Sequence, residues 1–212
     1  MKFLHFTNND DFDESTHAAP KLKKIWEVYQ ALLENFQKVY TPSRDVSVDE
    51  SLMAYKGRLS WVQFIATKHA RFGIKIFMLC ESQTGYIWNS VLYTGSLTRN
   101  TATMACLLRQ FWVWLRNLLG KGYCITMDNF YTSPELLDIL IKNKTDMYGT
   151  VRSNRKKLPN NFAKEKLNKA TLKPDRRARW WLFGGKTKKM SVWWVQSMMR
   201  CCLWSRQKEA KT

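Results

Sequence analysis

The chain has 212 residues, of which 45% are apolar, and it carries 35 Lys and Arg against 17 Asp and Glu, a formal net charge of +18. This apolar content is enough for the packed core of one domain. Five cysteines are an odd and modest number, which argues against a secreted disulfide scaffold, and they include no C-x-x-C pair of the kind that binds zinc. No stretch of about 18 uncharged apolar residues is present, so we predict no membrane span. We expect an intracellular globular protein with a large positive surplus.

The positive charge is concentrated near the end of the chain. The net charge is −3 over residues 1–50, +6 over residues 51–150 and +15 over residues 151–212. The last part also contains five of the ten tryptophans. Cations beside aromatic side chains suit a phosphate backbone and its bases. A solvated basic extension has the same composition, so both interpretations stay open.

The first half of the chain predicts one helix followed by strands. Apolar residues recur at steps of three and one from Lys21 to Tyr40, which predicts a helix with one buried face. Four later segments share a high content of β-branched and aromatic residues and predict strands. They are Val46–Tyr55, Trp61–Ile65, Gly73–Cys80 and Tyr86–Tyr93.

The second half alternates helices and strands. We predict a helix over Thr101–Leu119, a strand over Tyr123–Asp128 and a strand over Tyr148–Arg152. Between these two strands, Ser133 is expected to cap a helix that begins at Pro134. Beyond residue 153 the sequence predicts no element. A run of strands followed by strand–helix–strand alternation favours a mixed α/β sheet flanked by helices.

Two carboxylates occupy informative positions. Asp49 lies within the first predicted strand, and Asp128 ends the strand that begins at Tyr123. An acid at a strand end points into the crevice where α/β sheets bind ligands. Two such acids on neighbouring strands could hold divalent metal ions for an in-line displacement at phosphorus. An aspartate before a turn is also an ordinary capping residue, so spacing alone leaves both roles open.

Six short sequence blocks follow one another between residues 20 and 158. They are DESLMAYKGR at 49–58, FGIKIFMLC at 72–80, TGY at 84–86, YTG at 93–95, DNFYTS at 128–133 and GTVRSNRK at 149–156. The residues of these blocks and the order in which the blocks occur resemble the piggyBac transposase family. This resemblance implies an RNase H-like core of the DDE/D type, in which three aspartates bind metal ions and process DNA. It implies Asp49 and Asp128 as catalytic and metal-binding residues, Mg²⁺ or Mn²⁺ as cofactor, DNA as partner and the nucleus as location.

The sequence also departs from the family pattern. Nothing in it matches the third aspartate, the cysteine-rich zinc module or the N-terminal dimerisation region, so pairing would involve a full-length relative. We expect an acidic lead-in at 1–20, a partial RNase H-like core at 21–158, truncated before the last core helix, and a basic, Trp-rich tail at 159–212. The codons available to residues 183–191 also permit a family-like Trp-Lys-Asp-Lys run one nucleotide earlier. The tail is therefore interpreted as frameshifted or disordered.

Three functional hypotheses follow. The leading one is a transposon-derived, catalytically incomplete core that is inactive alone. The second is a weak metal-dependent nuclease in which Glu50 or Asp175 replaces the missing acid, although Glu50 should face away from Asp49 on the strand. The third is a sequence-nonspecific nucleic-acid-binding module without catalysis. Its phosphate contacts would be Lys56, Arg58, Arg152, Arg155, Lys156 and Lys157, although a solvated turn is the more ordinary role for the first two.

Overall fold

The computed structural model describes residues 8, 20–95, 114–152, 155, 158, 171–174, 181–185 and 191–195. Most of the predicted helix Thr101–Leu119 lies outside these residues, and residues 114–116 at its end are helical. The chain divides into two compact units, which are described in turn. The first comprises Met1–Pro42 and Asp49–Asn117, and the second comprises Ser43–Val48 and Leu118–Thr212. The predicted domain boundaries at residues 20 and 158 stay a prediction.

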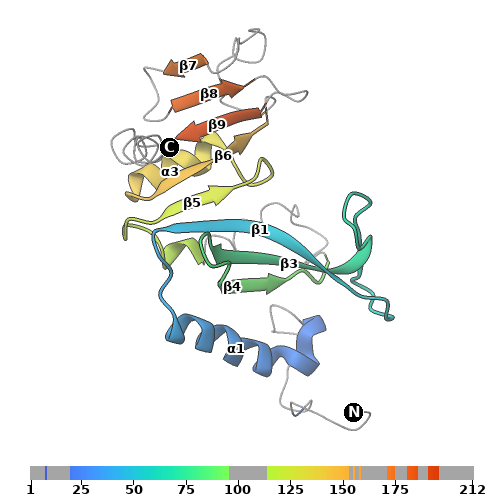
Figure 1. The fold of residues 1–212 in the computed structure, drawn as a ribbon. Helices are drawn as coiled ribbons and strands as arrows, with labels where there is room; N and C mark the ends of the chain where they lie inside the picture. Colours follow the sequence, from blue (N-terminus) through green and yellow to red (C-terminus); the bar gives the residue numbers. More distant parts are fainter. Residues whose placement is uncertain are drawn as a thin grey trace. The chain divides into compact units, whose positions relative to one another are not determined.

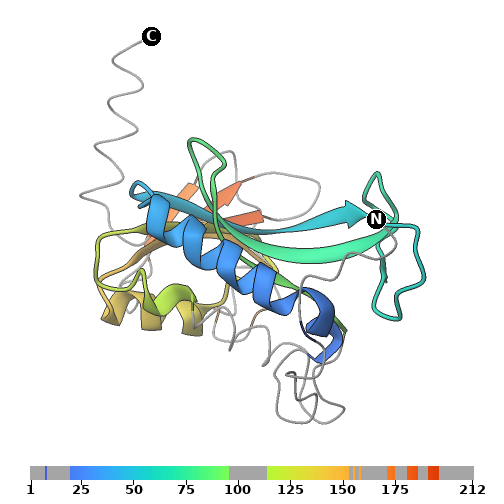
Figure 2. The same cartoon turned by 90° about the horizontal axis from the view of Figure 1, so that it is seen from below.

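The first unit combines a helix with antiparallel strands (Figure 1). A short 3₁₀ helix, η2 (Pro20–Ile25), leads into α1 (Trp26–Val39). β3 (Phe72–Glu81) pairs antiparallel with β2 (Gln63–Phe64) and β4 (Ile87–Leu92), and its other neighbour is β1 (Asp45–Ala54). Figure 2 shows α1 lying across one face of these strands. The four predicted strands of this region are confirmed, with β2 shorter than expected.

Polar side chains attach α1 to the β3–β4 hairpin. Tyr29 Oη lies 2.9 Å from Ser90 Oγ, and Trp88 Nε1 donates to the Tyr40 carbonyl at 3.2 Å. The carboxylate of Glu81 is buried and accepts hydrogen bonds from Tyr40 Oη, at 2.8 Å, and from Thr84 Oγ1. A buried carboxylate is stabilised only by such partners. These bonds determine how the helix lies on the hairpin.

The expectation that all apolar residues of this helix form one buried face is wrong. Leu22 and Leu33 are buried, but a second row of apolar side chains is exposed, and Val39 is 82% exposed. The members of this exposed row are Ile25, Val28, Leu32, Phe36 and Val39. A helix packed on one sheet buries a stripe about 100° wide. The apolar residues spread over a wider arc, so the sheet covers only part of them.

The second unit contains the parallel part of the sheet. The first residues of β1 pair in parallel with β5 (Cys124–Met127), from Asp45↔Cys124 to Val48↔Met127. β5 in turn pairs in parallel with β6 (Asp146–Val151), and α3 (Pro134–Lys142) connects these two strands. Leu137 and Leu140 of α3 are fully buried, as are Ile125 and Met147 on the strands. The predicted strand–helix–strand succession is confirmed.

Three further strands continue the sheet beyond β6. They are β7 (Thr171–Pro174), β8 (Trp181–Gly185) and β9 (Ser191–Val195), all antiparallel to their neighbours. β9 lies beside β6, and β8 and β7 follow. These strands fall where the sequence predicts no element. Parallel strands beside antiparallel ones, with helices packed on them, confirm the predicted mixed α/β class. Among the described residues, no helix is long and apolar enough to cross a membrane.

Candidate functional site

Asp128 follows the last residue of β5 and begins a tight turn that leads into α3. Its backbone carbonyl accepts hydrogen bonds from Tyr131 N at 3.1 Å, Thr132 N at 3.2 Å and Thr132 Oγ1 at 2.9 Å. Ser133 Oγ then accepts from Leu136 N at 3.2 Å and caps α3 as predicted, with Pro134 at the first helical position. The turn therefore holds the exposed Asp128 side chain at a strand end.

The Asp128 carboxylate is oriented by two donors. Its Oδ1 accepts from the backbone N–H of Asn129 and from Thr150 Oγ1 at 3.3 Å. Thr150 lies on β6, and the close approach of β6 to β5 depends on Gly149. A Cβ at Gly149 would lie 2.2 Å from the Met127 carbonyl oxygen, well inside van der Waals contact. The glycine thus allows Thr150 to reach the carboxylate.

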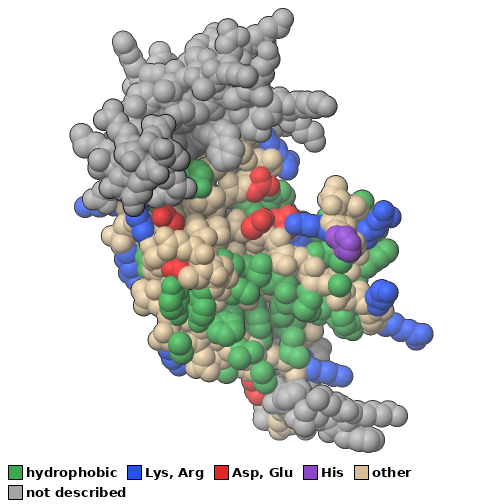
Figure 3. Space-filling view, in the orientation of Figure 1, with side chains coloured by type: hydrophobic (Ala, Val, Ile, Leu, Met, Phe, Trp, Pro, Cys, Tyr) green, Lys and Arg blue, Asp and Glu red, His purple; other side chains and the backbone are tan. Residues whose placement is uncertain are grey.

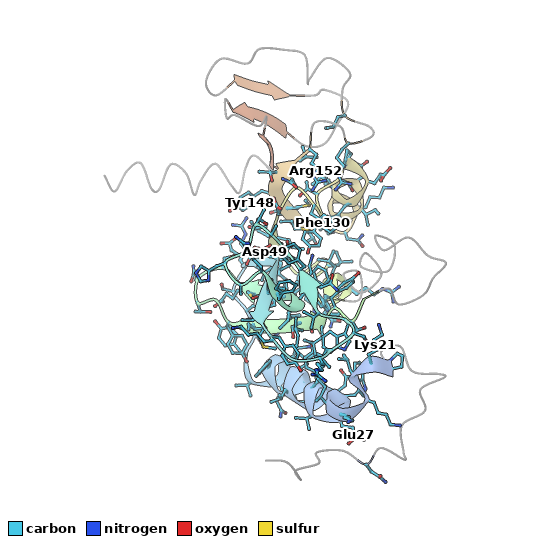
Figure 4. All side chains as sticks on the ribbon, turned by 90° about the vertical axis from the view of Figure 1, so that its right-hand side faces the viewer. Lys21, Glu27, Asp49, Phe130, Tyr148 and Arg152 are labelled. Atoms are coloured by element: carbon cyan, nitrogen blue, oxygen red, sulfur yellow. The ribbon has the colours of Figure 1, made fainter. Side chains whose placement is uncertain are left out.

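Two arginines from the end of β6 bind the same turn. Arg152 Nε donates to Asn129 Oδ1 at 3.1 Å. Arg155 Nη2 donates to the carbonyls of Asn129, at 3.2 Å, and Phe130. Figure 4 labels Arg152 and Phe130, two residues of this network. Arg155 was predicted as a phosphate contact, and the structure places its guanidinium on the backbone carbonyls of the turn.

The environment of Arg155 is unusual for a cation. The side chain is half-buried, and its Nε is buried without a hydrogen-bond partner among the described residues. Burial lowers the pKa of Arg155, the neighbouring charge of Arg152 lowers it further, and Glu135 partly opposes this shift. A guanidinium stays charged under such conditions. Its charge strengthens the hydrogen bonds to the two carbonyls.

Asp49 lies on β1 in the first unit and is labelled in Figure 4. Its carboxylate is exposed and accepts a hydrogen bond from Glu50 N at 2.8 Å. Burial raises the pKa of the half-buried Cys80 thiol, and the negative charge of Asp49 raises it further. Asp49 therefore lies near Cys80 of β3. The reactivity of the Cys80 thiol therefore reports on the position of the Asp49 carboxylate.

The other predicted site residues lie elsewhere or outside the described residues. Lys56 and Arg58 are exposed between β1 and β2. Lys156, Lys157 and Asp175 lie outside the described residues. Glu50 is half-buried, whereas its neighbour Asp49 is exposed. The structure thus brings Arg152 and Arg155 to the Asp128 turn within the second unit.

The sequence profile of the family Transposase IS4 matches residues 1–208. The chain belongs to this transposase family. Two human (Homo sapiens) proteins, PiggyBac transposable element-derived protein 3 and the Chimeric ERCC6-PGBD3 protein, are each 31% identical over 177 residues. These matches cover 80% of the chain but 29% and 16% of the relatives, so the chain spans under a third of either.

A solved piggyBac transposase is similar in fold. That structure, a synaptic complex with hairpin DNA, matches with a TM-score of 0.71 and 25% identity. The match covers 88% of this chain and 41% of the transposase. The predicted piggyBac resemblance and RNase H-like fold are confirmed. The DNA in that complex is bound by the relative.

A DDE transposase family implies a divalent metal ion. Asp49 and Asp128 supply exposed carboxylate oxygens, the hard donors that Mg²⁺ and Mn²⁺ prefer. In the part of the chain that the structure describes, no group of three or more His, Cys, Asp or Glu is arranged to hold a metal ion. The donor chemistry fits the ion, while the described residues do not complete the three-aspartate set of the family.

Two residues of the site were not predicted. Thr150 binds the Asp128 carboxylate, and Asn129 connects Arg152 and Arg155 to the turn. Hydrophobic periodicity does not distinguish these polar residues from solvated neighbours. Both fall inside the blocks at 128–133 and 149–156 that carry the family resemblance, and this was the available signal. Their roles depend on the parallel register of β5 and β6.

Proposed function

We propose that this chain is a transposon-derived segment of a piggyBac-type catalytic core that binds DNA and a divalent metal ion but is catalytically incomplete alone. The setting of Asp128 carries this proposal. Within the described structure, both hydrogen bonds of its carboxylate are made by Oδ1, from Asn129 N and Thr150 Oγ1. The side chain is exposed, and Oδ2 is the oxygen through which it would bind Mg²⁺ or Mn²⁺.

Asp49 is the second proposed metal-binding residue. In the piggyBac pattern, Asp49 matches the first of the three aspartates and Asp128 matches the second. When bound, the metal would stabilise negative charge on the attacking and leaving oxygens of a phosphodiester. Arg152 donates a hydrogen bond from its Nε to Asn129. Its remaining N–H groups would donate to a phosphate of the DNA strand that contains this phosphodiester.

The incompleteness of the site is the finer part of the proposal. The family pattern requires a third aspartate, and the described residues contain no three-acid cluster. With only part of the metal clamp, the chain would hold the ion weakly and would not align the attacking and leaving oxygens. We therefore expect DNA and metal binding without strand cleavage.

This proposal is tested by two measurements on the purified chain. Binding of Mn²⁺ is followed by electron paramagnetic resonance, and nicking of supercoiled plasmid is followed in the same buffer. We expect weak Mn²⁺ binding that falls at least about tenfold in Asp128→Asn, with no nicking. Asp138→Asn, on the exposed side of α3, is the matched control. Unchanged Mn²⁺ binding in Asp128→Asn would exclude the metal site.

The nuclease and binding-module hypotheses have distinct outcomes in these assays. Mn²⁺-dependent nicking that both Asp49→Asn and Asp128→Asn abolish would establish the nuclease instead. DNA binding that is unaffected by either substitution, together with absence of Mn²⁺ binding, would establish the binding module. The exposed Lys56 and Arg58 favour the DNA-binding part of the proposal. Replacing a cation that neutralises one phosphate should reduce the slope of log affinity against log salt by about 0.9 on duplex DNA.

The family also motivates two proposals about the cell. We place the chain in the nucleus, where its DNA substrate is, and we propose that it pairs with a full-length relative. Microscopy of a fluorescent fusion tests the first, and exclusion from the nucleus would contradict it. Co-purification with a tagged piggyBac transposase tests the second, with the tag alone as control.

A further inference from the structure

The projecting part of the first unit, residues 56–72, presents two phenylalanines to solvent. Phe64 on β2 and Phe72 at the start of β3 are direct register partners across the antiparallel pair. Their ring centroids lie 4.8 Å apart at an interplanar angle of 45°. The two side chains are 58% and 59% exposed, respectively. They form one contiguous aromatic surface, which we call the phenylalanine pair.

A small buried core and paired backbone support the phenylalanine pair. Trp61 and Ile74 are buried with Leu22 in a small core at the base of the projection. Backbone hydrogen bonds from Ile65 N to Arg71 O, at 2.8 Å, and from Lys68 N to Ile65 O, at 3.2 Å, close the loop between the two phenylalanines. The rings are therefore held outward by backbone that is paired on either side, while neighbouring apolar residues fill the core.

The charged residues near the pair in the sequence are all basic. Residues 51–80 contain five Lys and Arg and no Asp or Glu. Lys68 and Arg71 lie between the two phenylalanines in the chain and are exposed. Lys75 differs, because its Nζ lies 4.8 Å from the ring centroid of Phe77. Figure 3 shows Lys and Arg side chains gathered with apolar ones on the part of the surface that projects at the right.

We propose that this projection binds unpaired nucleotides of DNA, with bases stacked on Phe64 and Phe72 and the backbone phosphates at Lys68 and Arg71. Aromatic faces stack with every base, and adjacent cations follow the sugar–phosphate backbone. Five cations and no acid within residues 51–80 complement a polyanion and disfavour a basic second copy of this chain. The inference rests on the proposed function, because it takes DNA as the substrate and specifies unpaired nucleotides as the part that is bound here.

The test separates stacking from general apolarity and from metal chemistry. Affinity for a fluorescent oligothymidylate of about 15 nucleotides and for a duplex of the same length is measured by anisotropy in EDTA. Phe64→Leu/Phe72→Leu keeps apolar side chains without rings, and Phe64→Tyr/Phe72→Tyr keeps the rings. Phe36→Leu, an exposed phenylalanine on α1, is the matched control. Thermal unfolding of every variant checks the fold.

We expect the leucine pair to weaken single-strand binding at least about fivefold per ring, with a much smaller effect on the duplex. The tyrosine pair and Phe36→Leu should bind as the original chain does. Equal single-strand affinity of the leucine pair and the original chain would overturn the inference. So would an equal loss on both probes, or altered sedimentation with unchanged DNA binding, because the latter marks a protein interface.

A second variant keeps the inference testable if the leucine pair does not fold. Lys68→Ala/Arg71→Ala should lower the slope of log affinity against log salt on the single strand by about 1.4, the value for two neutralised phosphates. An unchanged slope would contradict the phosphate contacts. No affinity of the original chain for either probe would instead refute the proposed function, which distinguishes its failure from that of the stacking surface.

Discussion

Two groups of cations in this chain lie in different surroundings, and the sequence predicted phosphate contacts for the arginines of the first group only. At the Asp128 turn, Arg152 and Arg155 direct N–H groups inward, onto Asn129 and the backbone carbonyls that follow Asp128. On the projection, Lys68 and Arg71 are exposed beside two exposed phenylalanines. A basic residue within a family motif can thus hold the protein's own backbone, while a basic residue outside it can lie on a binding surface.

The largest expected effect is a loss of stability at the Asp128 turn, caused by a substitution on the neighbouring strand β6. Gly149→Ala should lower the free energy of unfolding by about 3 kcal/mol, because the new Cβ would meet the Met127 backbone and force β5 and β6 apart. Gly57→Ala is the control, since the atoms nearest its Cβ would be the far end of the Tyr55 side chain and not backbone. Denaturant unfolding measures both variants. Equal, small effects would show that the close approach of the strands is not needed.

A substitution of Arg155 tests directly whether a cation stabilises the Asp128 turn. Arg155→Ala should destabilise the chain by about 2 kcal/mol, because two backbone carbonyls lose a charged donor. Arg71→Ala on the projection should change the free energy of unfolding by less than about 0.5 kcal/mol. If Arg155 served only as a phosphate contact, the two substitutions would give similar unfolding curves.

Thr150→Val tests how the turn orients the carboxylate that we propose as a metal ligand, that of Asp128. Loss of the hydroxyl removes the donor to Asp128 Oδ1 while keeping the shape of the side chain. We expect Mn²⁺ affinity to fall about tenfold, as it does when an outer hydrogen bond to a ligand is removed, with a loss of about 1 kcal/mol in stability. Thr126→Val, on β5 and half-buried, is the control. Unchanged Mn²⁺ affinity would mean that Thr150 does not orient Asp128.

The smallest expected effect reports on Asp49. Its negative charge contributes to the raised pKa of Cys80, after burial. Asp49→Asn should therefore lower the pKa of that thiol, increase the thiolate fraction at pH 8 and speed alkylation of Cys80 about twofold. Peptide mapping of iodoacetamide-treated protein measures the rate at this one cysteine. Glu27→Gln, on α1, is the control and should leave the rate unchanged, and an unchanged rate in Asp49→Asn would place its carboxylate away from the thiol.

Much of the fold was predictable because it depends on local patterns. β1, β3, β4, β5 and β6 lie within two residues of their predicted bounds, and Ser133 caps α3 as the Ser-Pro pair indicated. Burial of α1 was not predictable in the same way. Its apolar residues occupy more of the circumference than one sheet covers, so the choice between Leu33, buried, and Leu32, exposed, depends on how the helix lies on the hairpin.

The sequence by itself indicated the order of the strands from β1 to β6 and the family, and it singled out Asp49 and Asp128 as candidates, because these inferences depend on residue types and on blocks of adjacent residues. Tertiary structure alone decided what surrounds Asp128. The register of β6 against β5 brings Thr150 and the arginines to a turn more than twenty residues earlier in the chain. Such partners are separated in sequence and joined only by strand pairing, so no local pattern records them.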